Sequence, residues 1–354
     1  MILSTTYALT SRLCNCIKSN IRQYATILTE QFDVSQFCTV VINSPCNIFV
    51  HPLDVFSDQN KVKVSVESTD IRNLPSVKYD KQGDTVAIRS GPNANCKNLT
   101  LNVFASLKAN LDITGYDCPI IIGNFYGRSI MANSESGDIS LGKSQCETID
   151  LSTNGGNITC KELTQAGTLK LSTLGKGSIT TDRLQALALR AKTVSGDITV
   201  GSSYCDESKF ETDFGILRLK NVHRNVNINI NNEGLLNITG LDGVLKAKIK
   251  KGLVDVQVAR FARSSEIVME DAGSLILRLS EECQKNTFVK LLTNHFVIAG
   301  GVNMKAEKEK DMGILIPTGN QEIDATLLAN CKNAHVLIDS SSWSKMFEQS
   351  VRKA

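Results

Sequence analysis

The chain has 354 residues, of which 42% are hydrophobic and 5% aromatic, and it carries 39 basic and 36 acidic side chains. This composition is typical of a folded protein and excludes a disordered one. Because the charges nearly balance, nucleic acid is not favoured as a partner. No run of 18 apolar residues occurs, which excludes a membrane-spanning helix.

Residues 1–24 hold three basic residues, many serines and threonines, and no acidic residue. This is the composition of a mitochondrial targeting peptide, without the continuous apolar core of a secretory signal. The stretch "RQYAT" matches a matrix-processing pattern and predicts cleavage near Ala25 and residence in the mitochondrial matrix. Cleavage would leave 36 basic against 36 acidic residues. An incidentally basic tail is the alternative.

Residues 27–110 contain four strand-like runs, "CTVVINS", "KVKVSVES", "DTVAIRS" and "LTLNVFAS", separated by Asn, Pro and Gly turns. Alternating apolar residues predict strands with one buried face. The runs lack the repeat that follows them, so we expect an amino-terminal β cap over residues 27–110.

Residues 111–279 contain a repeat of about twenty residues. The phrase "SGDISLG" at Ser136 returns as "SGDITVG" at Ser195. A glycine precedes an aliphatic strand in every copy, at Gly137, Gly156, Gly177, Gly196, Gly215, Gly234, Gly252 and Gly273. Half a period later a second alternating run recurs, for example "TIDLST" and "TLKLST". Each copy therefore predicts two strands and two turns.

Such a repeat cannot bury its apolar face alone, but stacked copies align their aliphatic residues in columns. We therefore predict an all-β fold, a parallel β-solenoid with two-strand rungs of about 20 residues. Glycine would recur because each corner needs a positive φ or a close backbone approach. A sandwich of antiparallel hairpins is the alternative, which the constant repeat length disfavours.

Residues 280–354 are predicted to hold carboxy-terminal strands and a capping helix. "FVKLLTNHFVIAGG" and "GILIPTG" read as strands around a charged loop, "KAEKEKD". The last stretch places Trp343, Met346, Phe347 and Val351 on one helical face after serines that suit a helix N-cap. We expect this helix to cover the end of the solenoid.

The "SGDI" corners, preceded by "NLTLNVFASLKANLDITGYDCPIIIGNFYGRSIMANSESGDISL", resemble the "putative-adhesin" β-solenoid domain family, whose function is unknown. The resemblance covers residues 32–279 and implies the solenoid fold. It also points to a mitochondrial-like animal member, of the family with sequence similarity 185 type. The corner pattern changes after Asp213, where Phe214 and Ile216 replace its Ser and Asp.

Two polar columns form the candidate interaction face. Their members are Asp138, Asn157, Ser178 and Asp197 beside the corner glycines, and Ser140, Thr159, Thr180 and Thr199 two residues further along. The functional interpretation is a flat platform for an extended partner. The alternative, which we favour, is a solvated face whose first column stabilises the turns.

A candidate basic patch comprises Arg218, Lys220, Lys246, Lys248 and Lys250, and it would suit an acidic protein or an anionic lipid head group. Eleven cysteines without a zinc-like spacing indicate a reducing compartment, and the four histidines lie far apart in sequence. Asp138 and Asp197 lie three rungs apart, about 14 Å, which is too far for paired glycosidase carboxylates. No catalytic, metal or cofactor site is predicted.

The leading hypothesis is a non-enzymatic scaffold that binds a protein partner through the solenoid surface. Whether the chain is an enzyme stays open, since a site can assemble across rungs without a linear motif. The alternatives are a carbohydrate-active enzyme of solenoid fold and a surface adhesin, which would need export.

Overall fold

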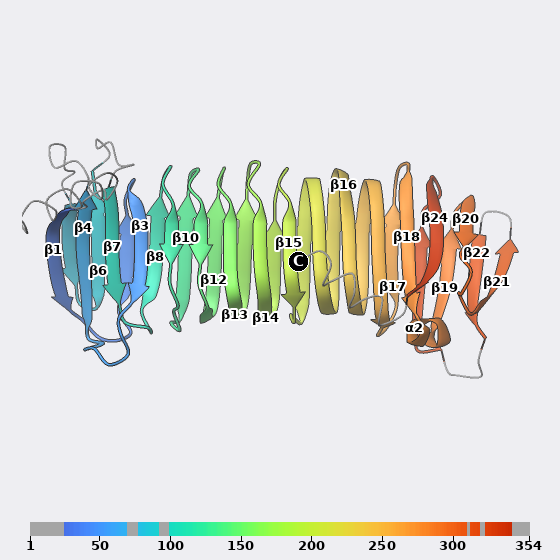
Figure 1. Cartoon of the computed structure of the whole chain (residues 1–354), viewed down its shortest axis with the longest axis horizontal. Helices are drawn as coiled ribbons and strands as arrows, with labels where there is room; N and C mark the ends of the chain where they lie inside the picture. Colours follow the sequence, from blue (N-terminus) through green and yellow to red (C-terminus); the bar gives the residue numbers. More distant parts are fainter. Residues whose placement is uncertain (1–24, 69–76, 92–98, 310–311, 319–322, 342–354) are drawn as a thin grey trace, which may run out of the picture.

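A computed structural model describes residues 25–68, 77–91, 99–309, 312–318 and 323–341, which form 24 strands and one helix. The strands stack into one long coil whose central rungs follow the order of the sequence (Figure 1). The predicted targeting peptide at 1–24 and the predicted helix with Trp343, Met346, Phe347 and Val351 lie outside the described residues.

Each rung contributes one strand to each of two hydrogen-bonded ladders. In one central rung, β11 (Ile139–Leu141) enters the first ladder and β12 (Ser144–Thr153) enters the second. β11 pairs in parallel with β13 (Ile158–Thr173), and β12 pairs in parallel with β10 (Ser129–Ser134) and with β13. This parallel register confirms the predicted solenoid and rejects the hairpin sandwich.

The first ladder runs, in neighbour order, through β1 (Ala25–Asp33), β4 (Lys61–Ser68), β7 (Leu99–Ala105), β3 (Asn47–Pro52), β9 (Ile120–Ile122), β11, β13 (Ile158–Thr173), β14 (Ile179–Lys192), β15 (Ile198–Ser203), β16 (Glu207–Phe261), β18 (Gly273–Ser280), β24 (Ala334–Ser341) and β20 (His295–Ile298). The long strands β13, β14 and β16 bend and continue into the second ladder.

The second ladder runs through β5 (Val77–Gln82), β6 (Thr85–Ser90), β2 (Thr39–Asn43), β8 (Asn110–Gly115), β10 (Ser129–Ser134), β12, the second parts of β13, β14 and β16, then β17 (Ser265–Met269), β23 (Ala325–Asn330), β19 (Thr287–Leu292), β22 (Met312–Pro317) and β21 (Met304–Glu309). Inward residues of both ladders form one continuous hydrophobic core.

Antiparallel strand pairs occur at both ends of the coil. At the amino-terminal end β4 pairs antiparallel with β1 and β7, and β5 pairs antiparallel with β6. At the other end β22 pairs antiparallel with β19 and β21. Residues 110 and 279 are the predicted domain boundaries, and strands from either side of each boundary pair in parallel. β2 pairs with β8, and β24 pairs with β18. The boundaries proposed at these residues stay predictions.

The segment "KAEKEKD" was expected to be a loop, and this expectation was wrong. Its first residues form β21, the outermost strand of the second ladder. Its alternating charges suit an edge strand, because charged side chains discourage further strand pairing. The helix α2 (Glu281–Asn286) lies near the same end and is capped by Ser280, whose Oγ accepts a hydrogen bond from the Cys283 N–H at 3.0 Å.

The corner glycines stack directly on one another. A Cβ built on Gly156 would lie 2.2 Å from the carbonyl oxygen of Gly137, and one on Gly177 only 1.8 Å from that of Gly156. Of the eight repeat glycines, only Gly252 has a positive φ, of 139°. Close backbone approach, rather than φ, therefore explains the repeated glycine.

A buried column of hydroxyl groups ties these corners together. Its members are Ser134, Thr153, Thr173, Thr193 and Thr212, all at most 6% exposed. The Thr153 hydroxyl accepts from the Gly156 N–H at 3.0 Å and donates to the Gly137 carbonyl at 3.2 Å, so it links two rungs. Such buried polar groups stabilise only when they are paired, as these are.

Candidate functional site

The first polar column forms a hydrogen-bonded ladder along the solenoid corner. The Asn157 N–H donates to Asp138 Oδ1 at 2.7 Å, and the Ser178 N–H donates to Asn157 Oδ1 at 2.9 Å. The Asp197 N–H in turn donates to Ser178 Oγ at 3.2 Å. These side chains therefore satisfy backbone donors of the next rung, as the turn-stabilising interpretation requires.

The second polar column lies in register on the first ladder. Ser140 pairs with Thr159, Thr159 with Thr180, and Thr180 with Thr199. The structure thus brings these four residues together as neighbours on one outward strip. Their side chains form no hydrogen bond with another described residue, so their role as an interaction face stays a prediction.

The candidate basic residues are divided between the two ladders, and their role as an interaction patch stays a prediction. Arg218 and Lys220 belong to the first ladder, whereas Lys246, Lys248 and Lys250 belong to the second. Arg218 pairs with Asp197 at 2.9 Å and Lys248 pairs with Glu270 at 2.9 Å. Two of the five charges are therefore neutralised locally.

The described residues contain no cluster of three or more His, Cys, Asp or Glu side chains able to hold a metal. Their cysteines are all buried. Burial raises the pKa of the Cys160 thiol to about 12 and that of Cys146 to about 11, so both stay protonated near neutral pH.

A groove lies outside the segments that connect the two ladders. These bridging segments are residues 144–146, 164–166, 184–186 and 203–205, which run side by side in register. Their inward positions carry Cys146, Ala166, Ala186 and Cys205. Small inward side chains let this part of each rung lie close to the core, which hollows the outer surface.

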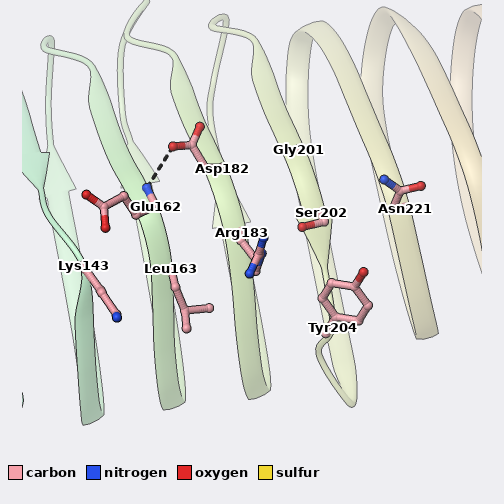
Figure 2. Close-up of a pocket in the computed structure, with 9 residues that line it drawn as sticks. All are labelled: Lys143, Glu162, Leu163, Asp182, Arg183, Gly201, Ser202, Tyr204 and Asn221. Atoms are coloured by element: carbon pink, nitrogen blue, oxygen red, sulfur yellow. Dashed lines mark hydrogen bonds between the residues drawn. The ribbon is translucent and has the colours of Figure 1, made fainter. Parts of the chain in front are cut away.

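The groove encloses about 1010 Å³ and crosses four to five rungs (Figure 2). It is lined by Lys143, Glu162, Leu163, Asp182, Arg183, Gly201, Ser202, Tyr204 and Asn221. A second hollow of about 430 Å³ adjoins it and shares Tyr204. This surface is the candidate functional site.

The charges in the groove are mixed and incompletely paired. The Asp182 Oδ2 atom accepts a hydrogen bond from the Glu162 N–H at 2.8 Å, while the two carboxylates point away from each other (Figure 2). Lys143 and Arg183 are both exposed, and within the described ranges neither side chain forms an ion pair or a hydrogen bond. The groove therefore presents two free cations.

A column of planar polar side chains runs beside these cations. Gln145 pairs in register with Gln165, and Gln165 with Gln185. Tyr204 follows on the next rung, is 49% exposed, and stacks on His223 with ring centroids 4.6 Å apart. Each glutamine amide is both a donor and an acceptor.

Backbone strain also concentrates here. Within the described residues, the non-glycine residues with positive φ are Glu162 at 60°, Asn221 at 47° and Arg224 at 63°. The first two line the groove and the third lines the adjoining hollow. Strained backbone persists where the surrounding structure holds it, often at functional sites.

Sequence reasoning missed this groove. The available signal was the glutamine at Gln145, Gln165 and Gln185, which recurs with the repeat and is outward by alternation. The buried hydroxyl column was also available, as a Ser or Thr three or four residues before the first five corner glycines. The distance between Lys143 and Arg183 could not be predicted from the sequence, because it depends on how each rung turns between the ladders.

No helix within the described part of the chain has the length and apolar character needed to cross a membrane.

The family model described as "Toastrack DUF4097" matches residues 50–324. Three solved structures are also similar. One, titled a putative adhesin from Parabacteroides distasonis, is 17% identical, with a TM-score of 0.37 over 71% of this chain and 96% of that one.

The second structure, titled a putative adhesin from Bacteroides fragilis, is 13% identical, with a TM-score of 0.32 over 65% of this chain and 95% of that one. The third, titled a putative cell adhesion protein from Clostridium sporogenes, is 12% identical, with a TM-score of 0.20 over 90% of this chain and all of that one.

Proposed function

Since this chain belongs to the Toastrack DUF4097 family, we propose that it is a non-enzymatic scaffold that binds a protein partner in the groove over its bridging segments. The carrying observation is that all three strained non-glycine residues within the described ranges line this groove or the hollow beside it. Solenoids commonly present such extended surfaces to their partners.

The other surfaces support this choice by elimination. The side chains of the Asp138 column already accept hydrogen bonds from the backbone of the next rung, and the basic residues are divided between two ladders. Within the described residues, the groove combines two free cations, amides and an exposed tyrosine. Tyr and Arg are enriched at the centres of protein interfaces, where water is excluded around them. An anionic lipid stays the alternative partner for Lys246 and Lys250.

We also propose that the protein resides in the mitochondrial matrix and that it is an animal mitochondrial member of the family. The support is the acid-free, basic composition of residues 1–24 and the "RQYAT" processing pattern. Fractionation of cells expressing a carboxy-terminally tagged chain, with mass spectrometry of the mature amino terminus, tests this. A start near Ala25 in protease-protected mitochondria is expected, and an intact Met1 in the cytosol contradicts it.

Site-specific photocrosslinking tests the binding role. A photoreactive amino acid at Gln165, in the hollow that adjoins the groove, is expected to capture one discrete protein in cells. The same amino acid at Thr180, on the outward strip of the first ladder, is the matched control. Equal capture from both positions, or none from Gln165, contradicts the proposed site.

A carbohydrate-active enzyme is the second candidate, because Glu162 and Asp182 place carboxylates on adjacent rungs of one groove. Paired carboxylates about 5–9.5 Å apart serve glycoside hydrolysis. Asp182 here holds the strained Glu162 backbone, which supports a structural role. Turnover of a polysaccharide that Glu162→Gln abolishes would favour the enzyme. A surface adhesin is the third candidate and requires the fractionation to place the chain outside the cell.

A further inference from the structure

The two free cations of the groove lie in one column. Ser144, Thr164 and Leu184 align across successive strands. The residues immediately before them, Lys143, Leu163 and Arg183, therefore align as well. Lys143 and Arg183 are therefore two rungs apart, with Leu163 between them. Figure 2 shows the three side chains along the middle of the groove.

This spacing selects one conformation of a bound chain. Two rungs span about 9.6 Å, because neighbouring strands lie about 4.8 Å apart. In a polyproline II helix, residues i and i+3 face the same side and lie about 9.3 Å apart. In a β-strand, the residues that share one side are two or four positions apart, which separates them by about 6.7 or 13.4 Å, so neither spacing matches the two cations. A polyproline II segment therefore matches the column.

The neighbouring glutamines meet the other requirement of such a ligand. A polyproline II segment makes no internal hydrogen bonds, so its carbonyls and N–H groups need outside partners. Gln145, Gln165 and Gln185 offer amides that donate and accept at each rung. Tyr204 closes the column with an exposed ring, the kind of surface on which polyproline II segments pack.

We propose that the groove binds an acidic polypeptide segment in the polyproline II conformation, with carboxylates three residues apart on Lys143 and Arg183. The Arg183 guanidinium can hold a carboxylate through two parallel hydrogen bonds, and the Lys143 ammonium acts as a point charge. This inference rests on the proposed binding function and names the chemistry of its partner.

Fluorescence anisotropy with a fluorescein-labelled peptide of repeated Glu-Pro-Pro units tests the proposal. We expect saturable binding, weakened about tenfold or more by combining Lys143→Gln with Arg183→Gln, because both carboxylates lose their partners. Tyr204→Ala is expected to weaken binding without changing its salt dependence. The matched control combines Lys246→Gln with Lys250→Gln, which removes two exposed cations from the second ladder and is expected to leave binding unchanged.

Several outcomes overturn the proposal. One is binding that the control variant weakens as much as the groove variant, and another is equal binding of a Lys-Pro-Pro peptide. A neutral oligosaccharide, cellohexaose, that displaces the peptide and still binds the Lys143 and Arg183 variant would assign the groove to glycan. If no peptide binds but the Gln165 photocrosslink captures a protein, the polyproline II inference fails and the proposed binding function stands.

Discussion

At the corners of the coil, backbone packing determines which residue is allowed. Seven of the eight corner glycines face the carbonyl oxygen of the glycine one rung before, and Gly137 faces that of Cys118, at distances that no Cβ atom tolerates. The adjacent Gly155 is different, because a Cβ there would meet its nearest atom, Ser136 Cβ, at an ordinary 3.5 Å. The position of Gly156 therefore excludes a Cβ atom, whereas the position of Gly155 has room for one.

The substitution Gly156→Ala is expected to lower the free energy of unfolding by about 2 kcal/mol, because the new methyl group forces two rungs apart. Gly155→Ala is expected to be neutral or slightly stabilising, since it only reduces the freedom of the unfolded chain. Urea denaturation followed by circular dichroism measures both. Equal losses at the two positions would contradict the close-approach explanation.

Glu211 is the centre of a charge cluster on β16. Its carboxylate lies 3.1 Å from Lys192 Nζ, 3.3 Å from Lys209 Nζ and 3.6 Å from Arg190 Nη2. Burial acts to raise the pKa of Glu211, but the hydrogen bonds and charges of Lys192 and Lys209 outweigh it and lower that pKa below 4.5. The stabilising contribution is therefore present above pH 4.5 and lost as the pH falls through the lowered pKa.

Glu211→Gln is consequently expected to reduce stability by about 1 kcal/mol at pH 7, with the deficit shrinking as the pH falls below 4.5. Urea midpoints measured from pH 7 to pH 3 reveal this convergence. Glu207→Gln is the control, because this exposed acid on the same strand forms no ion pair with any described residue. A deficit for Glu211→Gln that does not change with pH would show that the cluster is not electrostatic.

Residue-level prediction from the sequence succeeded where one repeat copy contains the answer. The inward aliphatic positions, such as Ile139 and Ile158, follow from alternation, and both are fully buried. The groove could not be predicted in the same way. Its shape depends on small inward residues at one bend and on the left-handed backbone at Glu162 and Asn221, which no alternation pattern encodes.

At the scale of elements, the ends of the coil show how an open sheet avoids further pairing. The terminal strands β5 and β21 carry alternating charges, and the ladder turns antiparallel beside each of them. Charged edges are a common protection against association between sheets. The sequence predicted an amino-terminal cap from irregular strand spacing, but the charge run before residue 310 was wrongly interpreted as a loop, because charge also marks loops.

The edge role of β21 predicts an effect on assembly. Replacing Lys305 and Glu309 together by Ile is expected to cause concentration-dependent self-association, because an apolar edge strand offers unpaired backbone groups to another molecule. Sedimentation velocity against the unmodified chain measures it.

The matched control replaces Lys246 and Lys250 by Ile on β16, whose backbone is already paired on β17. This control adds similar apolar surface without a free edge, so it should leave the sedimentation coefficient unchanged. Association of the control variant to the same degree would attribute the effect to apolar surface alone.

At the scale of the whole molecule, the family match and the parallel register confirm the solenoid that the repeated "SGDI" corners predicted. The prediction succeeded because a stacked repeat uses only nearest-neighbour contacts, so one copy specifies most of the fold. The order of the strands at the ends of the coil could not be predicted from nearest-neighbour stacking. β2 and β3 lie inside the ladders while later strands cap them, and this order depends on long-range pairing.

Nearest-neighbour stacking predicts that one complete rung can be removed. Deleting residues 234–251 joins Glu233 to Gly252 and lets Gly252 stack on Gly215, so every inward column keeps its register. We expect a folded, slightly less stable protein that retains the groove, because residues 143–221 are untouched. Circular dichroism and thermal unfolding measure the fold, and the Glu-Pro-Pro peptide measures the groove.

Deleting only residues 234–242 removes about half a rung and provides the decisive comparison. The strand that follows would then enter the wrong ladder and turn its apolar residues toward solvent, since a solenoid tolerates whole repeats but not fractions of one. This variant is expected to lose cooperative unfolding. If it folded as well as the whole-rung deletion, the rung would not be the folding unit, and the stacking that positions Lys143 and Arg183 would need another explanation.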